Sequence, residues 1–190
     1  MYVLPDFLTV DNAPNIPPLS SGQKYKLIAR NCFDPGQLMW YAALAGISQA
    51  ANTDAYYGQG TAGYAQRYAV RFADGTIQDF MTRGVFPSFL HQDPRYFRLG
   101  RGSTMHRALY AVERIVITRS DSGERQFNYS EIVGGAVSGG ISTYAYHHNR
   151  NISNALNTWG TQVGYDALAF LVREFWPDVH EKLHKSHHNP

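Results

Sequence analysis

The sequence predicts an all-α fold: a compact bundle of five or six helices, with an extended N-terminal arm and one short β-hairpin. Three observations point to it. Helix-start signals recur along the chain, several segments carry small or apolar residues at three- and four-residue spacing, and one pair of short β-type runs flanks Gly123. The 190 residues are enough for one compact domain and too few for two ordinary ones.

Charge and composition exclude several classes of protein. Lys and Arg number 17 and Asp and Glu 15, so the formal charge is +2, which excludes a strongly basic nucleic-acid binder and an acidic disordered chain. No apolar run approaches the roughly 18 residues of a membrane-spanning helix. Cys32 is the single cysteine, which excludes an internal disulfide framework and a Cys-based zinc knuckle.

Residues 1–19 form the predicted arm. Pro5, Pro14, Pro17 and Pro18 prevent a helix throughout this segment. We expect the arm to lie extended on a surface or on a partner. The apolar residues that would need covering there are Tyr2, Leu4, Phe7 and Leu8.

The predicted helical domain covers residues 20–178 and opens with two capping signals. Ser20 and Gln23 have the spacing of a capping box, ahead of a helix that ends near Phe33. Asp34 and Pro35 then suit the N-cap and first position of a second helix, which runs to about residue 52.

The remaining elements follow from the same signals. We expect helices over residues 61–83, 104–114, 128–146 and 152–175, the last of which is stopped by Trp176 and Pro177. Asp93 and Pro94 begin a short turn that reaches Arg98, and the hairpin around Gly123 joins residues 116–119 to residues 125–128.

Small residues form seams on two of these helices. Residues 61–83 carry an alanine stripe, an aromatic stripe, and a polar stripe made of Arg67, Arg71, Asp74 and Gln78. Gly135 and Gly139 form a Gly-x-x-x-Gly pair on the helix over residues 128–146. Such seams let helices approach closely, either inside the bundle or against a partner or a membrane.

The densest polar segment contains His91, Asp93, Arg95 and Arg98. In a functional interpretation His91 and Asp93 are metal ligands, or a base and the group that orients it, and the arginines bind an anion. In the structural alternative Asp93 caps a helix and the arginines form an ion-pair network. Asp166, four residues after Gln162 on an otherwise apolar helix face, is expected to be paired because an isolated buried charge is costly.

Residues 179–190 form a polar, histidine-rich tail. His180, His184 and His187 share a helical face if the last helix continues, a spacing that binds zinc or nickel. The alternative is a solvated, frayed chain end. No cofactor is implied by the sequence, which lacks the common phosphate-binding, dinucleotide and hydrolase motifs.

Several motifs resemble an uncharacterised family of small, exported-looking bacterial cell-envelope proteins. They include Tyr57-Gly-Gln-Gly60, the stretch from His91 to Phe97 (HQDPRYF), and the end Glu174-Phe-Trp-Pro-Asp178. The resemblance covers residues 20–178. It implies a cell-envelope location, periplasmic or associated with the outer membrane, with a leader peptide missing from this chain. It supplies no activity, cofactor or catalytic residue.

Two functions follow from these observations. The first is a non-catalytic structural or accessory subunit that packs into an envelope-associated oligomer through the arm and the Gly135–Gly139 face. Its partners would be further copies of itself, other envelope proteins, or lipid. The second is an enzyme, or a protein that binds an anion or a lipid headgroup, working at the segment from His91 to Arg98. The alternative location is the cytoplasm.

Overall fold

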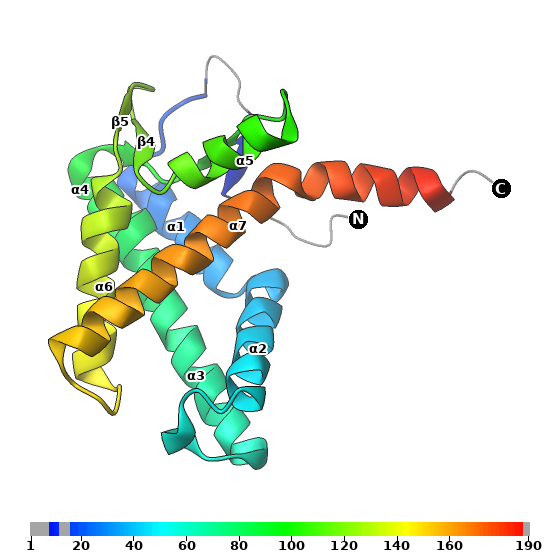
Figure 1. Cartoon of the computed structure of the whole chain (residues 1–190). Coiled ribbons are helices and arrows are strands. Elements are labelled where there is room, and N and C mark those ends of the chain that lie inside the picture. The colour runs from blue at the N-terminus through cyan, green and yellow to red at the C-terminus, as the bar shows by residue number, and fades with distance from the viewer. Residues whose placement is uncertain (1–7, 12–15, 188–190) are drawn as a thin grey trace.

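The computed structural model describes residues 8–11 and 16–187 of the chain (Figure 1). The structure is 71% helical, and its described residues form six continuous helices, one of which joins α3 and α4, and small strands that include a three-stranded antiparallel sheet. The predicted fold class is therefore confirmed.

The two predicted capping signals begin the first two helices. α1 spans Ser21–Cys32, and Ser20 and Gln23 form the reciprocal capping box. α2 spans Pro35–Ala50, and the Asp34 side chain accepts a hydrogen bond of 2.8 Å from the backbone of Gly36. Both signals lie within a few residues of each helix start, which is why the sequence alone is enough to locate them.

Two helices contain π-helical segments. α3, Gly60–Asp79, runs through the π segment η2, Phe80–Val85, into α4, so the helix continues beyond the predicted end at residue 83. The π segment η3, Ser130–Gly134, likewise leads directly into α6. The bounds of the other helical elements are η1 Ala55–Tyr57, α4 Phe86–Leu90, α5 Thr104–Glu113 and α6 Gly135–Ala145. η2 and η3 pack against each other.

Short strands form two small sheets. Their bounds are β1 Thr9–Asp11, β2 Gln92–Asp93, β3 Tyr96–Arg98, β4 Ile117–Ser120 and β5 Arg125–Phe127. β4 and β5 form the predicted hairpin, and Gly123 in its turn has a φ of 90°, which favours glycine. Two further pairings leave no local signal in the sequence: β2 adds a third antiparallel strand, and β1 pairs in parallel with β3.

The last helix, α7, spans Ile152–His187, so the prediction that Pro177 stops it is wrong. Figure 1 shows α7 changing direction in its C-terminal part. A proline inside a helix removes one backbone hydrogen bond and bends it. Here the bend is held from outside, because the Glu174 carbonyl oxygen accepts hydrogen bonds from Arg98 Nε, 3.0 Å, and Arg107 Nη2, 2.7 Å.

The interior of the protein is unusually polar. A small apolar cluster made of Tyr96, Ala111, Ile115 and Phe170 joins β3, α5 and α7. Among the described residues, however, buried polar side chains outnumber buried apolar ones by about two to one. Buried polar groups are costly unless they are hydrogen-bonded, so their partners decide which helices pack together.

Exposed apolar side chains form two helical stripes that meet at the hairpin. One follows α5 to Val116, and the other runs from Phe127 along η3 and α6. We call the joined stripes the apolar band; its members are Met105, Leu109, Val112, Val116, Phe127, Tyr129, Val133, Val137, Ile141 and Tyr144. The Val116 carbonyl accepts a hydrogen bond from the Asn128 backbone, which links the stripes. None of the described helices has the length and hydropathy that crossing a membrane requires.

Candidate functional site

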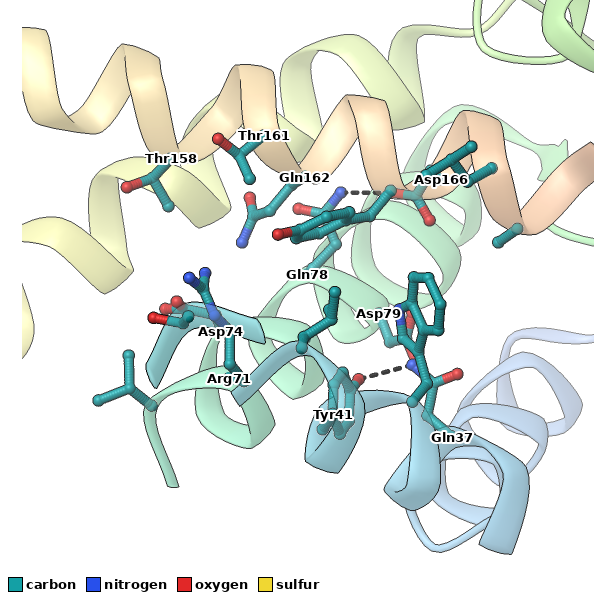
Figure 2. A pocket seen from close by; sticks show the side chains of 18 of the residues that line it. Gln37, Tyr41, Arg71, Asp74, Gln78, Asp79, Thr158, Thr161, Gln162 and Asp166 are labelled. Atoms are coloured by element: carbon teal, nitrogen blue, oxygen red, sulfur yellow. Dashed lines mark hydrogen bonds between the residues drawn. The ribbon is translucent and has the colours of Figure 1, made fainter. Parts of the chain in front are cut away.

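A cavity of about 630 Å³ lies between α2, α3 and α7 (Figure 2). Its volume is within the range of roughly 300–1,000 Å³ that is typical of small-molecule sites. Gly75 on α3 makes room for one of its walls, because a side chain there would overlap the Tyr41 hydroxyl group. Burial raises the pKa of Tyr41 to about 12, so this hydroxyl group stays neutral at physiological pH.

A buried charge cluster occupies one end of the cavity. Arg83 forms ion pairs with Asp79, one turn earlier, and with Asp166 on α7 at 2.7 Å. Gln78 Nε2 donates to the second oxygen of Asp166 at 2.8 Å (Figure 2), and Asn31 donates to Asp79 at 2.8 Å. The cluster confirms the expectation that Asp166 is paired. It also ties α3 to α7, because both buried carboxylates depend on their partners.

Glu131 on η3 interacts with this cluster but does not line the cavity. Burial, together with the neighbouring Asp166, raises the pKa of Glu131 well above its ordinary value, and Arg83 opposes the shift only in part. The protonated form of Glu131 is therefore favoured in the folded protein. Arg83 and Glu131 thus come from the two π segments, η2 and η3, and π segments are found frequently at functional sites.

A second polar group lies nearer the start of α3. Asp74 accepts hydrogen bonds from the Tyr146 hydroxyl group and from His147 Nε2, the latter at 3.1 Å. Burial and the charge of Asp74 raise the pKa of Tyr146. A carboxylate that holds one imidazole nitrogen fixes the tautomer and leaves the other nitrogen as a proton acceptor. Because Asp74 and His147 line the cavity, this pair is the strongest candidate for acid–base chemistry there.

Arg67 closes the cavity wall around η1. Its guanidinium group is fully buried and donates to the carbonyl oxygens of Gly58, 2.6 Å, and Asp54, 2.7 Å. Arg71, one turn later, faces the Asp54 carboxylate at 3.6 Å. These arginines hold a loop and a carboxylate in place.

Four buried side chains on the wall have polar atoms without a hydrogen-bond partner. Neither Oε1 nor Nε2 of Gln162 is bonded, and Oε1 of Gln78, Oδ2 of Asp34 and Nε of Arg67 are also unpaired. Each of these side chains is more than nine-tenths buried. Figure 2 shows the Gln162 amide projecting from α7 into the space between the helices. Unpaired buried polar groups are rare and costly, so their concentration here marks a place where a ligand can supply the missing bonds.

The structure does not bring His91 and Asp93 together. His91 ends α4 in the left-handed conformation, with a φ of 53°, and its side chain is 85% exposed. Asp93 is buried and pairs with Arg95 through bonds of 2.6 to 3.2 Å, while Arg98 pairs with Asp178. These contacts form a structural ion-pair arrangement, in which Asp93 receives the Arg95 backbone N–H as well.

The described members of the predicted interaction surfaces are covered by the chain itself. Gly135 and Gly139 face Trp159 and Ala155 of α7, so this seam packs within the chain. Leu8 is fully buried. The remaining residues of the predicted arm interaction, Tyr2, Leu4 and Phe7, lie outside the described part of the chain.

α7 carries His180, His184 and His187, although the side chains of the last two are not described. Among the described residues, no group of three or more metal-binding side chains is placed to hold an ion.

One pattern in the sequence could have indicated the cavity. The polar stripe on residues 61–83 would face solvent on an ordinary surface helix, yet Arg67, Asp74 and Gln78 are buried. His147 gave no such signal, because it meets Asp74 only through a contact across 73 residues.

Comparisons with models of protein families, with curated proteins and with solved structures found no match to this chain. The geometry of the cavity and the chemistry of its wall are therefore the observations that bear on function.

Proposed function

We propose that this protein binds a small polar organic ligand in the cavity between α2, α3 and α7. The observation that carries the proposal is the buried amide of Gln162, which faces the cavity with both its donor and its acceptor unpaired. A folded protein keeps such a group at a cost to its stability, which a ligand that completes both hydrogen bonds offsets.

The surrounding groups support this proposal. Apolar and aromatic walls supply most of the contact area in ligand pockets, and a few fixed polar groups supply orientation. Here Trp40 and Tyr165 contact each other from α2 and α7, with ring centroids 6.2 Å apart. The Arg83 cluster and the Asp74–His147 pair supply polar groups that are held by partners within the protein.

Thermal unfolding in the presence of chemically diverse small metabolites tests the proposal. At 100 times its dissociation constant, a ligand stabilises the folded state by about 2.7 kcal/mol, or roughly 5–11 °C in a chain of this size. We expect at least one compound to stabilise the unmodified protein but not the Gln162→Leu variant. Gln126→Leu is the matched control, because Gln126 has an unpaired amide nitrogen on β5, away from the cavity. If Gln162→Leu keeps the full ligand-induced shift, the proposed site is wrong.

The apolar band favours a second function, that of a structural or accessory subunit in a cell-envelope oligomer. Leu109 and Met105 expose more than 60% of their surface, and exposed apolar stripes of this length are typical of an interface. We propose a second copy of this chain as the partner that covers it. The envelope location rests on the sequence resemblance, and cell fractionation, with the cytoplasm as the alternative, tests it.

The mass of the protein in solution tests this assembly. We expect an oligomer by light scattering, and dissociation by Leu109→Glu together with Val137→Glu. Phe89→Glu is the control, because Phe89 is 83% exposed but lies outside the band. A monomeric unmodified protein contradicts the second copy. Binding of that monomer to phospholipid vesicles, or co-purification of a different envelope protein, would assign the band to another partner.

A further inference from the structure

We propose that the ligand of this cavity is neutral and rich in hydroxyl groups, as saccharides are. This inference rests on the ligand-binding function proposed above and specifies the chemistry of the ligand. Three properties of the cavity wall carry it: the kinds of unpaired atoms, the pairing of the charges, and the aromatic rings.

The unpaired atoms on the wall include both acceptors and donors. The acceptors are Oδ2 of Asp34, Oε1 of Gln78 and Oε1 of Gln162, and the donors are Nε2 of Gln162 and Nε of Arg67. A hydroxyl group donates and accepts through one atom, whereas an ammonium group only donates and an ionised phosphate or carboxylate only accepts. A ligand with several hydroxyl groups can therefore satisfy both kinds of atom, and a purely cationic or anionic ligand cannot.

The charges of the wall are largely satisfied within the protein. Arg83 is shared between Asp79 and Asp166, Arg71 faces Asp54, and Asp74 is bonded by Tyr146 and His147. These groups hold one another in pairs, so they offer no strong field to an ion of either sign. A neutral ligand enters such a site without leaving its own charge unpaired.

The aromatic residues complete the match. Trp40 and Tyr165 lie in an edge-to-face arrangement, with an interplanar angle of 88°. The electron-rich face of an aromatic ring packs favourably against the weakly positive C–H groups on one face of a sugar ring. Tyr41 adds a neutral hydroxyl group, whose oxygen already accepts a hydrogen bond of 2.7 Å from Gln37.

Asp34→Asn is the sharpest variant for testing this chemistry. Oδ1 of Asp34 is held by the backbone N–H groups of Gly36 and Gln37, so an asparagine must keep its oxygen there and place its NH2 group where Oδ2 lies now. Asparagine caps helices as well as aspartate does, so we expect an unchanged fold. The substitution thus turns one free acceptor into a donor. A ligand hydroxyl group can turn to accept from this NH2 group, but a neutral hydrogen bond then replaces one to a carboxylate, which should weaken saccharide binding by about 5- to 10-fold.

Isothermal titration calorimetry and tryptophan fluorescence measure this binding directly. The neutral probes are maltose, cellobiose, N,N′-diacetylchitobiose and myo-inositol; the comparison probes are spermidine as a cation, citrate as an anion and adenosine as a planar base. The unmodified protein is compared with Asp34→Asn and Gln162→Leu, and with Gln126→Leu as the control.

The possible results separate this inference from the function on which it rests. Binding of a neutral probe by the unmodified protein and the control, weakened in the other two variants, supports both. Binding of spermidine, citrate or adenosine but of no neutral probe overturns the saccharide assignment and leaves the ligand-binding function standing. If no probe binds, both are overturned. A saccharide that binds all four proteins equally lies outside the cavity, which also overturns the inference.

Discussion

Replacing Gln162 by leucine should make this protein more stable while removing its ligand site. The Gln162 side chain is more than nine-tenths buried and neither end of its amide is bonded. Burying an amide without a partner costs about 1–3 kcal/mol by mutational data, and leucine has a similar volume without polar atoms. We therefore expect the free energy of unfolding to rise by about 1–3 kcal/mol. For a chain of this size, that corresponds to an increase of roughly 2–12 °C in Tm.

Urea unfolding followed by circular dichroism measures this change, and Gln78→Leu is the matched comparison. Gln78 lies on the same wall, but its Nε2 bonds the buried Asp166 carboxylate at 2.8 Å. Losing a hydrogen bond to a charged group costs about 1.5–3 kcal/mol, so Gln78→Leu should be destabilising. A Gln162→Leu variant that is less stable than the unmodified protein by more than about 1 kcal/mol would refute the reasoning, because the amide would then have a partner that stabilises the fold.

Three further predictions concern buried charges and close packing. Because folding raises the pKa of Glu131, the contribution of this residue to stability is complete below its ordinary pKa of 4.5 and is lost as the pH rises through the folded-state pKa. Glu131→Gln should therefore be more stable than the unmodified protein at neutral pH but not at pH 4. Urea unfolding at several pH values measures the difference, and parallel profiles would contradict it.

Burial alone would raise the pKa of Glu174, but hydrogen bonds from Arg107 and from backbone N–H groups outweigh it and lower the pKa. Its stabilising effect is therefore present above 4.5 and lost in acid. Glu174→Gln should lower the free energy of unfolding by about 3–5 kcal/mol at pH 7. A decrease of less than about 1 kcal/mol would contradict this, because Arg107 would then not depend on the Glu174 carboxylate.

Gly139→Ala and Gly140→Ala form a pair on α6. A Cβ atom at Gly139 would lie 3.1 Å from the α7 backbone, whereas one at Gly140 meets nothing within 4 Å. Gly140→Ala should stabilise by about 1 kcal/mol, and Gly139→Ala should gain less or destabilise. Equal Tm values for the two variants would contradict the close contact with α7.

The sequence by itself determined the elements whose causes are local. The Ser20 and Asp34 caps act within three residues, and the turn at Gly123 joins two adjacent strands, so short patterns predicted each of them. The sequence also predicted that Asp166 is paired, because a carboxylate on an otherwise apolar helix face needs a partner.

Only the tertiary structure decided which residues pair with the buried carboxylates and where the cavity lies. Gln78 meets Asp166 across 88 residues and His147 meets Asp74 across 73, and neither contact leaves a periodic trace in the sequence. The same holds for Pro177. A proline usually ends a helix, but α7 continues through Pro177, and two arginines from elsewhere in the chain bind the carbonyl oxygen of Glu174 one turn before it. Local preferences amount to a few kcal/mol, and buried hydrogen bonds to charged groups are large enough to override them.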